Sequence, residues 1–99
     1  MIEQLLAENE GKTIEFKETT RSLNGIMKTL VAFANSAGGT IVIGVKDKTK
    51  DLVGLSEILS EEERLANAIT DSILPLLTPD IEVQSIRGKK LLIIRVSPV

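Results

Sequence analysis

The 99-residue chain has no cysteine, histidine, tryptophan or tyrosine, and it has only two phenylalanines. The lack of cysteine excludes disulfides and thiolate zinc sites, and the lack of histidine excludes imidazole metal ligands and the usual acid–base group at neutral pH. So few aromatic rings argue against a platform on which single-stranded bases would stack. Any chemistry must therefore use carboxylates, amines and the backbone.

The chain also has no long apolar run and no basic leader. No hydrophobic segment approaches the ~20 residues that cross a bilayer, and the first ten residues are acidic, unlike a signal peptide. With 42% hydrophobic and 26% charged residues, the composition is that of an ordinary globular protein. We expect one domain over residues 1–99, located in the cytoplasm and without a membrane partner.

The net charge of −2 hides an uneven distribution along the sequence. Residues 1–11 sum to −3, residues 12–50 to +4, residues 51–82 to −7 and residues 83–99 to +4. The balance of the whole chain gives no support to nucleic-acid binding, but a fold that places the two basic segments side by side would build a basic surface. The alternative is a solvated surface of mixed charge.

Hydrophobic periodicity predicts a short helix at residues 2–8 and then the order strand, helix, strand, helix, strand, strand. The expected segments are 13–18, 24–37, 40–46, 60–74, 81–86 and 90–97. A strand–helix–strand unit requires a right-handed crossover and a parallel pair, whereas the last two strands form an antiparallel hairpin around residues 87–89. The predicted fold is therefore α/β (α+β) in two layers, with a mixed sheet of about four strands and two main helices on one face.

Local signals predict where these elements end and which faces they bury. Asn24 is the expected N-cap of the first main helix, Gly38 and Gly39 stop it, and Ser60 with Glu63 forms a capping box for the second. In the first strand, alternation points Ile14 and Phe16 inward. It divides the second strand into two faces: Ile41, Ile43 and Val45 against Val42, Gly44 and Lys46.

Residues 91–96 form a dense apolar run in the last expected strand. At an exposed sheet edge, such a strand would be a hazard for pairing with other chains. We therefore expect either that the native chain continues past Val99 as part of a longer protein, or that a second copy covers this strand in a homodimer.

Three stretches together resemble a known family, namely ENEGKTIEFKE, IMKTLVAFANSAGGTIVIGVKD and the later VGL. They are similar to the AlbA-like domain of the Schlafen superfamily, and the likeness covers residues 8–96. Its most specific part is AFANSAGGTIVIGV, in which a helix ends in Gly38 and Gly39 before a strand that carries Gly44. The resemblance implies an Alba-like β-α-β-α-β-β fold and a DNA-binding module of a bacterial or archaeal transcriptional regulator.

Some members of this family are labelled ATP-binding, which directs attention to Gly38 and Gly39. A phosphate cradle requires the order strand, glycine-rich loop, helix, so that backbone N–H groups at a helix N-terminus face the phosphate. Here the glycines follow a helix, where carbonyl groups and the negative end of the dipole would repel phosphate. We interpret them as a C-cap turn and expect no cofactor.

The resemblance also implies a catalytic alternative, because Glu10, Glu15 and Asp47 are similar in spacing to the acidic triad of the Schlafen ribonucleases. If their strands are neighbours, the three carboxylates would hold Mg²⁺ or Mn²⁺, and a metal-bound water would attack RNA. The structural alternative is that Glu15 pairs with Lys17 or Lys46 and that Asp47 opens a turn.

The favoured function is non-sequence-specific nucleic-acid binding, with either DNA or structured RNA as the partner. The candidate phosphate contacts are Lys17, Lys46, Arg87, Lys89 and Lys90. Such contacts hold a duplex without identifying its bases. A metal-dependent endoribonuclease and a dimerising scaffold are the two alternative functions.

Overall fold

The computed structural model describes residues 13–72 and 79–98. Within these ranges the chain forms β1 (Ile14–Lys17), α2 (Leu23–Ala34), β2 (Gly39–Ile43), α3 (Ile58–Asp71), β3 (Asp80–Ile86) and β4 (Lys89–Val96). This is the order that periodicity predicts, and the short helix expected at residues 2–8 lies outside the described residues. Neither α2 nor α3 is long and apolar enough to cross a membrane.

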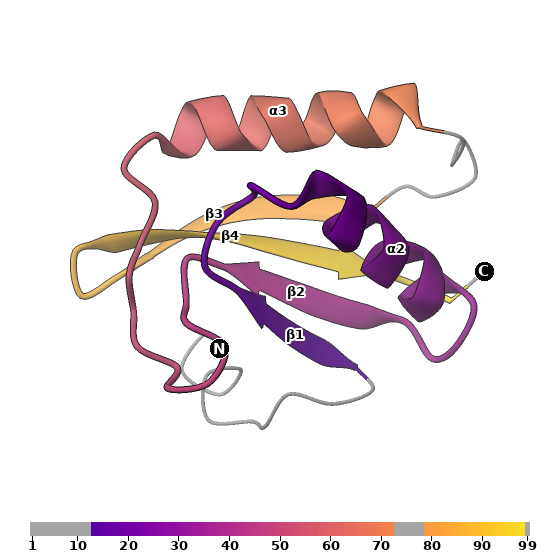
Figure 1. The fold of residues 1–99 in the computed structure, drawn as a ribbon, viewed down its shortest axis with the longest axis horizontal. Helices are drawn as coiled ribbons and strands as arrows, with labels where there is room; N and C mark the ends of the chain where they lie inside the picture. Colours follow the sequence, from indigo (N-terminus) through magenta and orange to yellow (C-terminus); the bar gives the residue numbers. More distant parts are fainter. Residues whose placement is uncertain (1–12, 73–78, 99) are drawn as a thin grey trace.

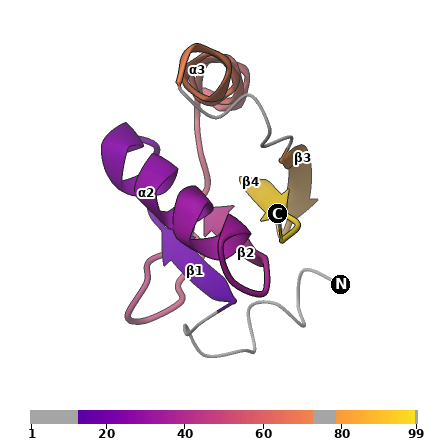
Figure 2. The ribbon, with the colours of Figure 1, turned by 90° about the vertical axis from the view of Figure 1, so that its right-hand side faces the viewer.

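The strands form one mixed sheet in the order β1-β2-β4-β3. β1 and β2 are parallel, with Phe16 opposite Val42, and β4 runs antiparallel to both β2 and β3. Both helices lie over one face of this sheet (Figures 1 and 2). The prediction of a two-layer α+β fold with a mixed sheet and helices on one face is confirmed.

β4 is the last strand in sequence, but it is an inner strand of the sheet. Its residues Leu91–Ile94 are fully buried between β2 and β3. The prediction of an exposed edge at this strand is therefore wrong, and the reason for expecting a second copy to cover it is lost. A strand buried on both faces is a near-continuous apolar run, which explains the composition of residues 91–96.

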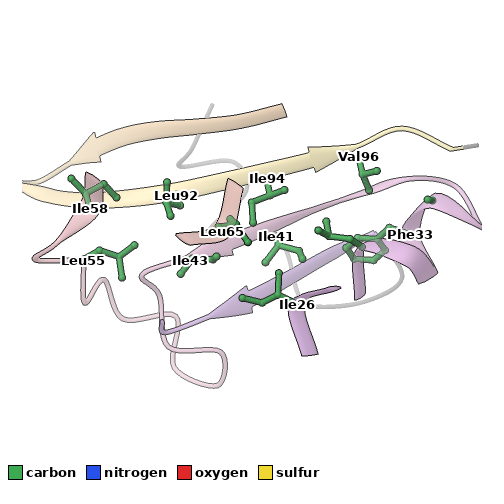
Figure 3. Packing of buried hydrophobic residues seen from close by; sticks show 12 residues of the cluster. Ile26, Phe33, Ile41, Ile43, Leu55, Ile58, Leu65, Leu92, Ile94 and Val96 are labelled. Carbon is green, nitrogen blue, oxygen red and sulfur yellow. The ribbon is translucent and has the colours of Figure 1, made fainter. Parts of the chain in front are cut away.

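The main hydrophobic core fills the space between the helices and the sheet (Figure 3). α2 contributes Ile26, Leu30 and Phe33, and α3 contributes Ile58 and Leu65. The sheet contributes alternate positions of its two inner strands: Ile41, Ile43, Leu92, Ile94 and Val96. The period of two in the strands and the spacing of three and four in α2 therefore meet at one interface.

The opposite face of the sheet carries a second buried cluster, to which β1 contributes Ile14 and Phe16. Both side chains are buried as predicted, but they point away from the helices. The alternate positions, Glu15 and Lys17, therefore lie on the helix side. There, Glu15 Oε2 accepts a hydrogen bond from the Thr29 hydroxyl of α2 at 3.3 Å.

Gly44 interrupts the alternation that was predicted for the second strand. Its φ is +112°, and β2 ends one residue earlier, at Ile43. Val45 therefore joins Val42 in the second cluster instead of sharing a face with Ile41 and Ile43. A single antiparallel bridge from Val45 to Leu52 closes the loop that follows.

Both helices begin earlier than predicted. α2 has Ser22 at its N-cap position instead of Asn24, and no side chain caps it. α3 begins at Ile58 after Glu57, because Ile58 is buried in the main core, and Ser60 lies inside the first turn. The predicted capping box of Ser60 with Glu63 is therefore wrong.

The turn after α2 uses its two glycines for different purposes. α2 ends at Ala34, three residues before the predicted end, and Gly38 adopts φ +81° while its N–H donates to the Phe33 carbonyl at 2.8 Å. This is the left-handed turn expected of a glycine after a helix. Gly39 has another role, because a Cβ at this position would lie 2.5 Å from the Phe33 ring.

The hairpin between β3 and β4 turns on two residues, Arg87 and Gly88, instead of the predicted three. Their φ angles are +51° and +76°, and Ile86 lies opposite Lys89. Two consecutive positive φ angles are the signature of the type I′ turn, whose twist matches that of the flanking strands. Lys89 is therefore the first residue of β4.

Candidate nucleic-acid interface

Three basic segments meet at one end of the sheet. β1 and β2 are parallel, so Lys17 at the end of β1 and Lys46 just past β2 lie at the same end. β4 is antiparallel to β2, which brings the turn at residues 87–90 to that end as well. In Figure 1 this turn lies on the side to which the arrowheads of β1 and β2 point. We call this region, with Lys17, Lys46 and residues 87–90, the hairpin end.

Backbone hydrogen bonds connect these segments to one another. The N–H groups of Gly44 and Val45 both donate to the Lys17 carbonyl, at 2.8 and 3.2 Å. The Gly44 carbonyl in turn accepts from the N–H groups of Val53 and Gly54, each at 2.8 Å. The spacing of the basic side chains at the hairpin end is therefore set by regular backbone contacts between neighbouring segments.

The basic side chains at the hairpin end differ in the groups that they contact. The Lys17 ammonium lies 3.2 Å from Glu15 Oε2, so that this charge is already paired. Lys50 stands over the Phe16 ring at 5.6 Å. Lys46, Arg87, Lys89 and Lys90 are exposed, and among residues 13–72 and 79–98 none of the four has a carboxylate within salt-bridge distance. These four are the charges that a polyanion would meet first.

In Figure 1, α3 begins on the side of the hairpin turn, whereas α2 begins over the middle of the sheet. The free N–H groups and the dipole of a helix N-terminus create a positive potential that falls off within the first turn. The first turn of α3 contains Glu61, whose carboxylate offsets that potential. The positive charge of the hairpin end therefore comes from its basic side chains.

Carboxylates are unevenly distributed over the hairpin end. Exposed Asp47 and Asp51 alternate with the lysines of residues 46–50, and exposed Glu57 precedes α3. By contrast, residues 83–99 contain no acidic residue. The tip of the hairpin is thus the most strongly cationic part of the hairpin end, and the start of the glutamate-rich α3 borders it.

Thr20 ties the loop after β1 to α3, an arrangement that sequence reasoning missed. Glu61 accepts hydrogen bonds from the Thr20 N–H at 3.2 Å and from its hydroxyl at 2.9 Å. Arg64 donates to the Thr20 carbonyl at 3.0 Å, and Thr20 itself is 1% exposed. Because Thr20 and Glu61 are 41 positions apart in the sequence, no local pattern signals this contact.

The three carboxylates of the nuclease hypothesis are placed as follows. Glu15 faces α2 and contacts Lys17 and Thr29, which is the pairing with Lys17 that the structural alternative predicts. Asp47 is exposed in the turn after β2, and Glu10 lies outside the described residues. Among the described residues no three acidic side chains form a group that would hold a metal ion. The metal site therefore stays a prediction.

The opposite end of the sheet holds a hollow of about 530 Å³, between residues 37–40 and residues 95–98. Arg95 and Asp80 line it, and the Arg95 guanidinium contacts Glu82 Oε1 at 2.6 Å. Hydrogen bonds from Arg95 and then from Gln84 hold the pKa of the Glu82 carboxyl below its ordinary value. The cation at this end is therefore neutralised by its neighbours.

Comparisons with solved structures agree with this architecture. The N-terminal domain of a protein from Nitrosomonas europaea, named for its relation to the ATP-dependent DNA helicase RecG, matches with a TM-score of 0.78 and 27% identity. The match covers 99% of this chain and 71% of that structure. The DIP2311 protein of Corynebacterium diphtheriae matches with a TM-score of 0.72 at 20% identity, over 99% of this chain and 21% of its own. The second likeness shows the fold alone.

Sequence comparisons extend the likeness to a family. An uncharacterized ATP-binding protein of Ureaplasma parvum is 35% identical over an alignment of 78 residues, and the match covers 77% of this chain. The match covers 22% of that relative, so this chain spans about a fifth of its length. A family model described as Schlafen, AlbA_2 matches residues 10–99. Because that match takes in β1 through β4 and the Gly38–Gly39 turn between α2 and β2, this chain belongs to the Schlafen AlbA_2 family.

Proposed function

We propose that this domain binds nucleic acid through the phosphate backbone, at the hairpin end, as the DNA-binding module of a regulator. The contacts come from Lys46, Arg87, Lys89 and Lys90, with Lys17 at the margin because it is paired with Glu15. Exposed ammonium and guanidinium groups at a sheet end neutralise phosphates, and contacts with phosphates carry no sequence information. Binding is therefore independent of sequence and sensitive to salt.

The observation that carries this proposal is the meeting of two basic segments far apart in the sequence. Residues 12–50 and residues 83–99 each carry +4, and the antiparallel pairing of β2 with β4 places Lys46 and residues 87–90 at one end of the sheet. Had β4 paired with β2 in a parallel direction, the hairpin tip would stand at the opposite end. The name of the Nitrosomonas relative, which refers to a DNA helicase, points to the same class of partner.

A salt titration tests the proposal directly. Duplex DNA of random sequence is titrated with the protein at several salt concentrations between about 50 and 200 mM, and log K is plotted against log salt. Four phosphate contacts predict a slope of about −3.6, since each contact contributes about −0.9 for B-form DNA. The same measurement with structured RNA decides between the two partners. An affinity that does not change with salt would contradict the proposal.

The nuclease hypothesis has a separate test. Labelled tRNA is incubated with the protein and Mn²⁺, with Glu15→Gln as the comparison. Because Glu15 is engaged by Lys17 and Thr29, we expect intact RNA with both proteins. Cleavage by the wild type that is lost in Glu15→Gln would establish the metal-dependent ribonuclease instead.

A further inference from the structure

Residues 53–55 take the place beside β4 that β2 leaves open. β2 pairs with β4 only as far as Ile43, which lies opposite Leu92. Beyond this point, Leu55 donates its backbone N–H to the Lys90 carbonyl at 2.9 Å. The base of the basic hairpin is therefore held by β3 on one side and by residues 53–55 on the other.

Gly54 lies directly against Lys89. Its φ is +78°, and a Cβ built on it would lie 3.1 Å from Lys89 Cβ and 3.2 Å from Lys89 Cδ. The aliphatic part of the Lys89 side chain thus passes over the glycine, at a distance that leaves no room for a methyl group without a shift of a few tenths of an ångström. A side chain at residue 54 would therefore press against the aliphatic part of Lys89.

Gly54 is itself fixed to the segment that carries the other lysines. Its N–H donates to the Gly44 carbonyl at 2.8 Å, and the Gly44 N–H donates to the Lys17 carbonyl. Gly44 has φ +112°, and a Cβ there would lie 2.7 Å from Leu91 Cδ2. A continuous path of backbone contacts therefore runs from Lys17 through Gly44 and Gly54 to the hairpin.

We propose that Gly54 is a positioning residue for phosphate binding, which holds the Lys89 ammonium at a fixed place relative to Lys46 and Lys90. This inference rests on the proposed function of the hairpin end. Gly88 provides a matched control, because its φ of +76° is nearly the same but a Cβ there meets nothing within 4 Å. An alanine at either position suffers similar backbone strain, and only the one at residue 54 displaces Lys89.

The experiment is a double-mutant cycle on DNA affinity, with Gly54→Ala, Lys89→Met and the double variant, and with Gly88→Ala as the control. Methionine keeps a side chain of similar length at residue 89 and removes the charge. We expect Gly54→Ala to weaken binding about fivefold in the wild-type background and less than about twofold in the Lys89→Met background. Thermal melts should show similar losses of stability for Gly54→Ala and Gly88→Ala, which measures the cost of backbone strain alone.

Each result has a definite meaning. An equal affinity loss in both backgrounds would overturn the positioning role while leaving the proposed function in place. A wild-type protein that shows no salt-dependent binding would overturn the proposed function. In that case, the geometric part is measured by NMR of the Lys89 side chain, and unchanged Lys89 methylene resonances in Gly54→Ala would overturn it.

Discussion

The two ends of the sheet have similar backbone features, and they differ in whether carboxylates accompany their basic side chains. Each has a glycine with positive φ beside β4, Gly54 at the hairpin end and Gly38 at the other. Each has a hollow, of about 420 Å³ lined by Lys89 and Lys90 at the hairpin end and about 530 Å³ at the other. Among residues 13–72 and 79–98, no carboxylate lines the first hollow, whereas Asp80 lines the second and Glu82 pairs with Arg95.

The lack of a side chain on a glycine serves packing at one end and, in our proposal, the placement of charge at the other. Gly39 makes room for an aromatic ring of the core, and Gly54 makes room for the stem of an exposed lysine. Exposed cations that lack carboxylate partners have little structural benefit, because exposed ion pairs stabilise folds only slightly and lone surface charges less. The contrast supports the proposal that the Gly38 end serves stability and the hairpin end serves binding.

The largest expected effect is a loss of stability at the Gly38 end. Gly39→Ala places a methyl group 2.5 Å from the Phe33 ring, and overpacking of this kind costs about 1–3 kcal/mol. For a domain of this size the melting temperature should fall by roughly 4–8 °C per kcal/mol, as differential scanning calorimetry would show. The DNA affinity of the folded variant should equal that of the wild type. An unchanged melting temperature would show that Phe33 has another place to pack.

The second expected effect is a loss of affinity at the hairpin end. Replacement of Lys89 and Lys90 together by glutamine should weaken binding to duplex DNA about 20-fold near 100 mM salt and reduce the salt slope by about 2, because two phosphate contacts are lost. Arg95→Gln removes one positive charge from the opposite end and should change the affinity less than about twofold. If removal of one charge reduced the DNA affinity equally at both ends of the sheet, the proposed difference between the two ends would be wrong.

A smaller effect is expected at the contact between Thr20 and α3. Glu61→Ala removes the acceptor of two hydrogen bonds from Thr20, one from the N–H and one from the hydroxyl, and leaving these buried donors unpaired should cost about 1–2 kcal/mol in urea unfolding. Exposed Glu63 serves as the control, and Glu63→Ala should stay within about 0.5 kcal/mol of the wild type. If the two variants unfold alike, the loop after β1 does not depend on α3.

The smallest effect is a pH dependence at the Gly38 end. The Glu82 pKa is lowered in the folded state, so the contribution of this carboxylate is present above the unfolded value of about 4.3 and is lost as the pH falls through the folded value. The wild type should melt at a slightly higher temperature than Glu82→Gln at pH 6, and this difference should shrink to nothing in strong acid. If the difference in melting temperature did not change with pH, ionisation of Glu82 would not be its cause.

Periodicity predicted the order of the elements and most of their faces, because those properties depend on residues a few positions apart. The pattern of Ile14 and Phe16 gave the right alternation, but it could not say which side of the sheet the helices cover. The predicted face of Val45 was wrong, because Gly44, with its positive φ, interrupts the alternation and places Val45 on the same face as Val42.

Contacts between distant segments account for the remaining differences. The apolar run at residues 91–96 was interpreted as an exposed edge, although two buried faces explain it equally well, and only the strand order decides between them. The basic residues of the hairpin end could be selected from the sequence by their charge. The contacts of Glu61 with Thr20 and of Gly54 with Lys89 could not be predicted, because each joins two segments that only the complete fold brings together.

The position of β4 has a consequence for how the domain is made. A ribosome produces β1, β2 and β3 before any residue of β4 exists, yet β2 and β3 touch one another only through that strand. During synthesis, β1 and β2 therefore emerge before their neighbour β4 is available. Until β4 pairs with β2, Ile41 and Ile43 are exposed to chaperones and to other chains. The emergence of β4, rather than of any earlier segment, is the step that permits this sheet to close.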